Sequence, residues 1–366
     1  MTRIIEDVKL DICDVLMVPK RSKGDAGPSR KDVKLSRKYT FLNSGGVWEG
    51  FPLIAANMDT TGTIAMSRVL ASEDCMTCLH KHYPLEELKD FFANDPAKDR
   101  VFYTLGIRDD DIERLQQFSK LFPLRYVCLD VANGYTKYFV DKVKYVRDLM
   151  PEAVIMAGNV CTPEMVQELL IAGGADIVKI GIGPGSVCTT RIITGCGYPQ
   201  FSAVLECADA AHGLRGHICS DGGCTQPGDI AKVFGAGADF VMIGGMLAGT
   251  DECDGKWEMA AEVIWDEDGK EPPKVTGRTI KKNLKFYGMS SREAMDRYSG
   301  GVAHYKAAEG KCVKVPYKGP ALDVVRDIKG GVSSGMSIVG AVNLKDLSKC
   351  AAFIKVNRTH NQIFGG

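Results

Sequence analysis

The strongest constraint on the fold of this chain is a series of eight short, continuous apolar runs, each followed by polar residues or glycine. The runs span 52–58, 75–80, 101–106, 125–130, 154–159, 177–183, 217–222 and 240–245. Runs of this kind are typical of parallel strands that are buried on both faces, whereas half-exposed strands alternate between apolar and polar residues. Segments with helical spacing separate the runs, for example 163–172, 202–211 and 228–234. We therefore predict an α/β fold, a (β/α)8 TIM barrel, with an open doubly wound sheet as the alternative.

An internal sequence repeat, called the internal echo below, supports the barrel. The stretch GADIVKIG at 174–181 recurs as GADFVMIG at 237–244. In many barrels the strands at these positions lead into loops that bind phosphate. The echo thus predicts two equivalent βα units next to such a site.

The carboxyl ends of the predicted strands carry polar residues and glycine. They are Asn57 and Asp59, His80, Asp130, Asn159, Gly183, Asp221 and Gly244. Such residues also form ordinary turns, but the same rim is where barrel enzymes build their active sites. The repetition from strand to strand favours an active site at this rim.

The parts of the chain outside the repeat complete one catalytic domain spanning 1–366. We expect an N-terminal arm at 1–50 that caps the barrel, and eight βα units within 51–250. A protruding hairpin should follow strand eight at 251–285, with its turn at 266–269. An active-site flap and a closing helix should occupy 286–350.

The composition excludes several classes of protein. Lys and Arg together number 46, as do Asp and Glu, so no basic excess is present to attract nucleic acid. The most apolar stretch, 238–248, is too short for a membrane helix, and residues 1–11 lack the apolar run of a signal peptide. The 13 cysteines are an odd number spread through apolar segments, which is typical of reduced thiols. We therefore expect a cytoplasmic protein without nucleic-acid or membrane partners.

The loop GIGPGSVCTTR at 181–191 is the strongest local feature. Its alternating glycines can aim backbone N–H groups at an anion, or turn carbonyls toward a monovalent cation. Cys188 lies in this polar, glycine-rich loop beside Arg191, and is therefore a candidate nucleophile rather than an inert core thiol. Ser186 and the glycines that follow strands seven and eight could hold one phosphate, and Asp221 could bind a ribose hydroxyl.

One cluster resembles a zinc site but does not fit one. Cys75, Cys78, His80 and His82 have suitable spacing on paper. On a strand, however, Cys75 and Cys78 point to opposite faces, so the four side chains cannot converge tetrahedrally. We predict no structural zinc here.

Five motifs together resemble the IMP dehydrogenase/GMP reductase family. They are GPGSVCTTR (183–191), SDGG (220–223), GADFVMIGG (237–245), YGMSS (287–291) and EGKCVKVPYKG (309–319). The resemblance extends from KLDICDV at 9–15 to about residue 350. HKHY (80–83), LDVANGY (129–135) and MAGNV (156–160) are similar to the reductase branch.

Two alternatives remain open. The first is an IMP dehydrogenase without CBS modules, since no stretch here is long enough to contain that insertion. Those enzymes activate water with an Arg-Tyr pair on a mobile flap, but Arg297-Tyr298 lies too close behind the YGMSS motif, and we interpret it as an ordinary helix-end dipeptide. The second is a catalytically inactive nucleotide-binding barrel, against which the intact set Cys188, Thr190 and Glu309 argues.

The resemblance implies NADPH-dependent conversion of GMP to IMP with release of ammonia. In that reaction Cys188 attacks C2 of the purine and forms a covalent thioimidate. Thr190 relays a proton and Glu309 is the proton reservoir, because ammonia leaves poorly unless it is protonated.

The resemblance also implies the binding residues. For a potassium ion they are Gly183, Gly185, Cys188 and Arg191. For GMP they are Ser186, Asp221, Gly222, Gly223, Gly244, Gly245, Gly288, Met289, Ser290, Lys306 and Gly310. For NADPH they are Ser29, Arg30, Lys81, Asp130, Val131, Ala132, Gly183, Met289, Tyr305, Lys306, Ser334, Gly335, Met336 and Ser337. Ser29 and Arg30 would reach a neighbouring subunit's cofactor in a homotetramer.

The chain departs from the reductase pattern in two places. Lys306 stands where the pattern has arginine, which loses the planar fork suited to phosphate. The hairpin at 251–285 is longer than expected, and the resemblance gives it no role.

Overall fold

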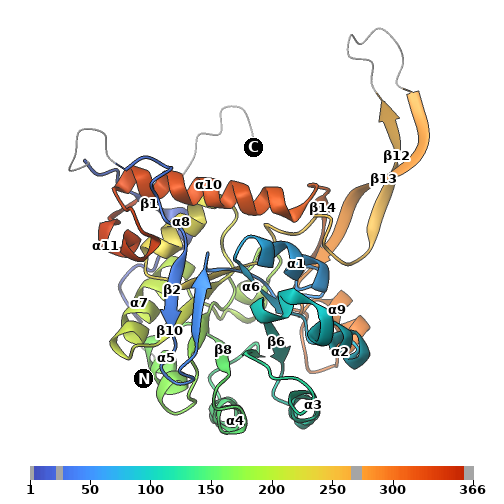
Figure 1. The fold of residues 1–366 in the computed structure, drawn as a ribbon, viewed down its shortest axis with the longest axis horizontal. Helices are drawn as coiled ribbons and strands as arrows, with labels where there is room; N and C mark the ends of the chain where they lie inside the picture. The colour runs from blue at the N-terminus through green and yellow to red at the C-terminus, as the bar shows by residue number, and fades with distance from the viewer. Residues whose placement is uncertain (1–3, 22–27, 265–273, 358–366) are drawn as a thin grey trace.

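Eight parallel strands close into a barrel in the computed structural model, which describes residues 4–21, 28–264 and 274–357 (Figure 1). Each strand pairs with its sequence neighbours, and the eighth returns to the first. The strands are β4 (Leu53–Ala55), β5 (Met76–Leu79), β6 (Val101–Leu105), β7 (Tyr126–Asp130), β8 (Val154–Val160), β9 (Ile177–Ile180), β10 (His217–Asp221) and β11 (Phe240–Ile243). The predicted barrel is confirmed, and the open-sheet alternative is wrong because β11 pairs with β4.

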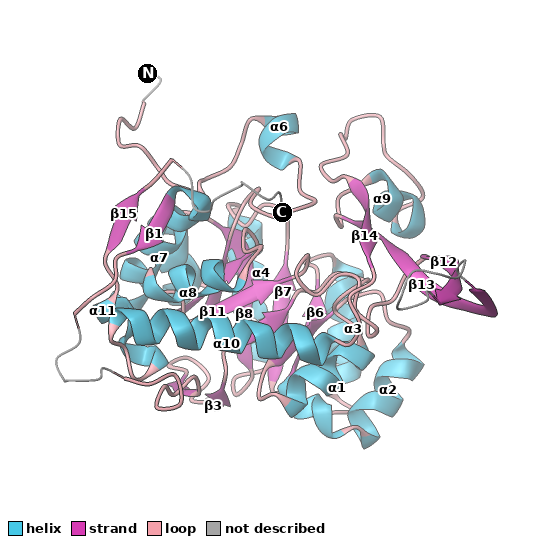
Figure 2. Cartoon of the chain, turned by 90° about the horizontal axis from the view of Figure 1, so that it is seen from above, coloured by secondary structure: helices cyan, strands magenta, loops and turns pink. Residues whose placement is uncertain are grey.

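Helices surround the barrel, and the last of them lies later in the chain than predicted. The first seven are α1 (Ile64–Ser72), α2 (Leu85–Asn94), α3 (Asp109–Ser119), α4 (Lys137–Leu149), α5 (Pro163–Ile171), α7 (Gln200–Gly213) and α8 (Pro227–Gly235). The eighth is α10 (Ala321–Val339), which packs against α8 and α1 (Figure 2). The expectation that all eight units end by residue 250 is therefore wrong. The glycine- and serine-rich stretch at 329–335 lies within α10.

The N-terminal arm covers the amino-terminal end of the barrel. Its hairpin consists of β2 (Arg37–Thr40) and β3 (Val47–Gly50). Tyr39 and Trp48 are buried against Phe240, the first residue of β11. A short sheet of β1 (Val15–Met17) and β15 (Phe353–Lys355) joins the two ends of the described chain.

Asp176 and Asp239, the aspartates of the two repeated GAD motifs, attach this arm to the barrel. Asp176, just before β9, accepts hydrogen bonds from the backbone N–H groups of Asn43 and Ser44 in the arm, at 3.1 and 3.0 Å. Asp239, just before β11, binds Arg37 of the arm at 2.8 Å. Each carboxylate also accepts a backbone N–H from the preceding barrel strand at 3.0 Å. At this end of the barrel, the internal echo therefore has a structural role.

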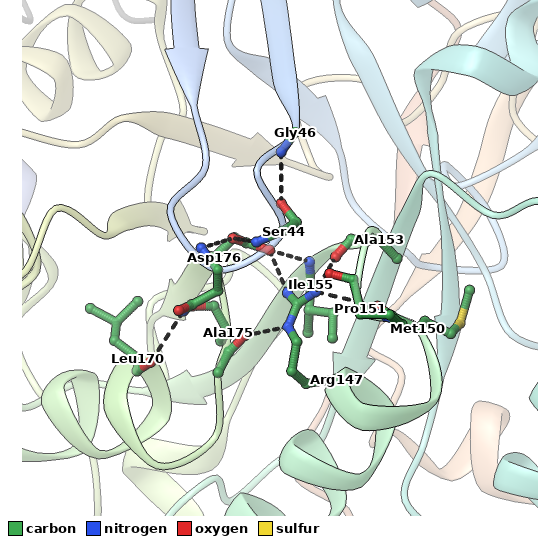
Figure 3. A network of polar contacts seen from close by, with 12 residues as sticks. Ser44, Gly46, Arg147, Met150, Pro151, Ala153, Ile155, Leu170, Ala175 and Asp176 are labelled. Atoms are coloured by element: carbon green, nitrogen blue, oxygen red, sulfur yellow. Dashed lines mark hydrogen bonds and ion pairs between the residues drawn. The ribbon is translucent and has the colours of Figure 1, made fainter.

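The Asp176 carboxylate also holds a buried arginine of α4 (Figure 3). Arg147 Nη2 lies 2.6 Å from Asp176 Oδ2, and the rest of the guanidinium donates to four backbone carbonyls. The Asp176 side chain is fully buried and that of Arg147 is 10% exposed. This network connects α4, the start of β9 and the arm.

The segment between β11 and α10 forms a separate antiparallel sheet that projects from the barrel (Figure 1). Its strands are β12 (Trp257–Ile264), β13 (Lys274–Tyr287) and β14 (Cys312–Pro316). The predicted hairpin is present, while its predicted turn at 266–269 lies outside the described residues. Helix α9 (Arg292–Tyr298) follows β13.

Across the described ranges, none of the helices combines the length and apolar character needed to span a bilayer.

Candidate active site

The glycine-rich loop leaves β9 and turns back over the barrel rim. Gly183 has φ +90°, and a Cβ there would lie 2.5 Å from Cγ of Arg191. The Arg191 guanidinium is held by both oxygens of Asp11, at 2.6 and 3.1 Å, and by the Tyr198 carbonyl. The KLDICDV motif of the arm therefore fixes the far end of this loop. The shape needs glycine because the arginine side chain occupies the place of a Cβ.

Three predicted catalytic side chains form a chain of hydrogen bonds. Cys188 Sγ donates to Thr190 Oγ1 at 3.2 Å, and Thr190 Oγ1 donates to Glu309 Oε2 at 2.8 Å. Cys188 is partly exposed, as a nucleophile must be. A hydroxyl that accepts from a thiol and donates to a carboxylate can pass a proton between them.

Backbone pairing brings Glu309 to this loop. The Thr189 N–H donates to the Glu309 carbonyl, and the Lys311 N–H donates to the Val187 carbonyl, each at 2.9 Å. The Glu309 N–H in turn donates to the Ser290 carbonyl at 2.9 Å. The nucleophile loop, the predicted base-binding segment 288–290 and the segment 309–311 therefore lie side by side.

Glycines and a serine line a cradle beside this loop. Gly222 and Gly223 follow β10 with φ +86° and +87°. A Cβ on Gly222 would lie 3.2 Å from the Gly185 nitrogen, and one on Gly245 would lie 2.6 Å from Ser186 Oγ. The loops after β9, β10 and β11 thus approach so closely that only glycine fits without displacement. Converging backbone amides of this kind suit a phosphate.

A buried lysine that was not predicted connects two of the predicted rim carboxylates. Lys179 Nζ lies 2.5 Å from Asp130 Oδ1 and 2.8 Å from Asp221 Oδ2. Asn159 Nδ2 donates to the same Asp221 oxygen at 2.9 Å. The signal that could have identified Lys179 is its charge within the apolar run 177–183.

A cavity of about 600 Å³ opens beside Asp130. It is lined by Lys81, Asp130, Val131, Ala132 and Met289, five of the residues predicted to bind the cofactor. Arg108 and Arg114 add positive charge to its wall. Its size and its mixed lining are those of a small-molecule site.

A sequence profile of the IMP dehydrogenase / GMP reductase domain matches residues 10–362. The chain belongs to this family. Among its relatives, a protein of Edwardsiella ictaluri (strain 93-146) named GMP reductase is 53% identical over 366 residues, which is 99% of each chain. Proteins of the same name from Yersinia pestis (strain Pestoides F) and Yersinia pseudotuberculosis serotype O:1b (strain IP 31758) are each 52% identical, again over 99% of each chain. The resemblance stated from the motifs is thereby confirmed.

The remaining predicted cofactor residues of this family member lie apart from the 600 Å³ cavity. Tyr305 is 85% exposed, and Lys306 Nζ lies 5.9 Å from the centre of its ring. Ser337 Oγ donates to the Pro28 carbonyl at 2.7 Å, which brings the segment 334–337 next to Ser29 and Arg30. Met336 is fully buried within α10, so this structure does not present it to a ligand.

The Arg297-Tyr298 dipeptide ends a helix, α9, as predicted, and it also makes contacts that the sequence did not predict. Asp59 Oδ2 accepts hydrogen bonds from Tyr287 at 2.6 Å, Tyr298 at 2.8 Å and Arg297 at 3.2 Å. The His82 ring stacks on Tyr298 at 3.5 Å. These residues also line a second cavity of about 1010 Å³. Asp59, after the first barrel strand, thereby fastens β13 and α9 to the rim.

The cysteine–histidine cluster is not assembled as a metal site. His80 stacks on Tyr83 while His82 stacks on Tyr298, and burial lowers the pKa of each histidine to about 4. Within the described ranges no group of three or more His, Cys, Asp or Glu side chains is placed to hold a metal ion.

Proposed function

We propose that this chain is a GMP reductase, an oxidoreductase that converts GMP, NADPH and a proton into IMP, ammonia and NADP+. The observation that carries the proposal is the hydrogen-bonded series Cys188, Thr190 and Glu309 beside a glycine cradle at the barrel rim. The names of relatives that are 52–53% identical over nearly the whole chain support it.

In the proposed mechanism, the Cys188 sulfur attacks C2 of the guanine ring while its proton passes to Thr190 and Glu309. The same relay returns a proton to the exocyclic nitrogen, the C2–N bond breaks, and ammonia leaves a thioimidate on Cys188. The nicotinamide cofactor, when bound, supplies the hydride that C2 receives. The C–S bond then breaks, IMP is released and Cys188 departs as the thiolate.

The proposed nucleotide site uses the residues that surround the nucleophile loop. The phosphate binds the backbone amides of Gly222, Gly223, Gly244 and Gly245 together with Ser186. Asp221 accepts from the ribose, and the base meets Gly288, Met289, Ser290 and Gly310. The close approach of Gly245 to Ser186 supports the phosphate assignment. Lys306 is included on the resemblance alone, and its Nζ lies 5.9 Å from the centre of the Tyr305 ring.

The proposed cofactor site extends over two subunits of a homotetramer. Lys81, Asp130, Val131, Ala132 and Met289 would bind the nicotinamide end in the 600 Å³ cavity, whose size and polar lining fit it. Gly183 and Tyr305 would complete this end. A neighbouring subunit would contribute Ser29, Arg30 and the segment 334–337, and the contact of Pro28 with Ser337 supports treating these as one surface.

A potassium ion is proposed for the nucleophile loop. Its ligands would be the carbonyls of Gly183, Gly185, Cys188 and Arg191, and backbone carbonyls are the donors that potassium sites in proteins use. The tight return of the loop, with the Cys188 N–H 3.0 Å from the Gly185 carbonyl, supports the assignment. When bound, the ion would hold the loop in the shape that presents Cys188. We further propose a cytoplasmic enzyme without membrane partners, because the 13 cysteines are an odd number spread through apolar segments, as is typical of reduced thiols. Nucleic-acid partners are not expected, because positive and negative side chains balance.

An IMP dehydrogenase activity is the less favoured proposal. Such enzymes need a mobile Arg-Tyr pair, whereas Arg297-Tyr298 lies too close behind YGMSS to be that pair and is also bound to Asp59.

The test is to incubate the protein with GMP and NADPH, and separately with IMP and NAD+, while following nicotinamide absorbance. We expect a change only in the first mixture. Cys188→Ala should abolish it, whereas Cys196→Ala, an exposed cysteine in the same loop, should retain it. Turnover only in the second mixture, or activity that survives Cys188→Ala, would refute the proposal.

A further inference from the structure

Lys179 is a charged side chain inside the barrel, where charge is costly unless it is paired. It is the third residue of β9 and its side chain is 3% exposed. Its neighbours on the strand, Val178 and Ile180, are fully buried and apolar. A buried ammonium costs several kcal/mol unless counter-charges and hydrogen bonds compensate it, so the position of Lys179 needs an explanation.

The ammonium lies beneath two rim carboxylates that belong to different proposed ligand sites. Asp130 ends β7 and lines the 600 Å³ cavity, while Asp221 ends β10 and precedes the glycines of the phosphate cradle. Their side chains are 35% and 21% exposed, respectively, so both reach the solvent side while Lys179 stays below. One buried cation therefore bridges the cofactor side and the nucleotide side.

We propose that Lys179 is a positioning residue that sets the separation of Asp130 and Asp221, and thereby aligns the nicotinamide cofactor with the purine nucleotide. The inference rests on the proposed function, because it takes the two carboxylates as ligand contacts. Lys179 touches neither ligand and acts through the carboxylates.

The surrounding groups leave Lys179 as the main counter-charge. Besides Asp130 and Asp221, the thiols of Cys78, Cys128 and Cys219 face it from β5, β7 and β10. Burial raises the pKa of Cys78 and Cys219 well above the ordinary thiol value, so both remain neutral.

Lys81 is the other cation that acts on Asp130. Burial by itself would raise the pKa of Asp130, but Lys179, with a smaller contribution from Lys81, lowers it below the ordinary value. Without Lys179, two carboxylates would share one site, and the pKa of at least one would rise.

The test compares Lys179→Met with wild type by equilibrium titration of NADPH, followed by its fluorescence, and of GMP, followed by calorimetry. At neutral pH we expect both ligands to bind roughly 10- to 100-fold more weakly, the range that one hydrogen bond to a charged group contributes. Affinity should recover as the pH is lowered, because protonation of one carboxylate relieves their repulsion. Wild-type protein should show no such recovery over the same range, and Lys179→Arg should behave like wild type.

The matched control is Lys329→Met, which removes another partly buried lysine. Lys329 pairs with Glu73 at 2.6 Å, is 24% exposed and lies on α10, away from the rim. It should lower the thermal midpoint without changing either affinity. If Lys179→Met does not fold, Lys179→Gln keeps a hydrogen-bond donor without the charge and should show the same pH-dependent loss.

The outcomes separate the two proposals. Wild-type protein that binds neither GMP nor NADPH refutes the proposed function, and the role of Lys179 with it. Wild-type binding, together with uncharged variants of normal affinity at every pH, refutes the role of Lys179 alone. A loss of stability with unchanged affinities, as in the control, would likewise assign Lys179 to structure only.

Discussion

Replacing Arg147 by Met tests whether the buried ion pair with Asp176 stabilises the fold. The substitution keeps much of the side-chain length but removes the cation 2.6 Å from Asp176. The Asp176 carboxylate would remain buried with three backbone N–H donors and no counter-charge. Up to four backbone carbonyls would also lose their donor (Figure 3).

The expected loss follows from this geometry. Removing one partner of a buried ion pair costs about 3–5 kcal/mol, because the other charge stays buried without its partner. Unfolding entropy is about 2.1 cal/mol/K per residue, or about 0.8 kcal/mol/K for 366 residues. The thermal midpoint should therefore fall by about 4–7 °C.

The assay is thermal unfolding followed by circular dichroism, with Lys137→Met as the control on the same helix. Lys137 pairs with Asp141 at 2.7 Å, but the two side chains are 86% and 58% exposed. Its loss should lower the midpoint by less than about 1 °C. Michaelis constants should be unchanged in both variants, because Arg147 lies at the end of the barrel opposite the rim. Equal shifts for the two variants would refute the reasoning.

Four further predictions concern the site and pH. Thr190→Val should lower kcat by about 10²- to 10⁴-fold with little change in the Michaelis constant for GMP, as rapid-mixing kinetics would show, because the proton relay is lost; unchanged turnover would exclude it. Gly245→Ala should weaken GMP binding in titrations at an unchanged thermal midpoint, since the added Cβ would lie 2.6 Å from Ser186 Oγ. Asp59→Asn should raise susceptibility of α9 to proteolysis, because three donors would lose their anionic acceptor. The hydrogen bond to Asp239 raises the pKa of His212 above 6.5. The protonated His212 therefore stabilises the fold fully below pH 6.5, and this stabilisation is lost as the pH rises through the raised pKa. His212→Gln should remove this contribution to the pH dependence of the thermal midpoint.

The local sequence was sufficient to predict the barrel strands and to single out the candidate nucleophile. Each buried parallel strand must be apolar on both faces, so the eight runs are visible without knowledge of their partners. The loop at 181–191 is equally local, because its glycines and Cys188 lie within eleven consecutive residues. The motifs were long enough to predict the family and, by resemblance, the pairing of Thr190 with Glu309.

Only the tertiary structure decided which distant groups meet. Glu309 reaches Thr190 because its segment pairs with the nucleophile loop across 119 positions of the chain. The barrel likewise places Asp130 and Asp221 over Lys179. In the sequence, the two aspartates are only charges at strand ends and Lys179 is only a charge within a strand, so nothing there shows that they meet. The eighth helix was misplaced for the same reason, since helical spacing does not tell which helix fills the gap between β11 and β4. Local patterns reflect the burial and the turn of each segment, whereas contacts between segments depend on strand order and closure, which no single segment contains.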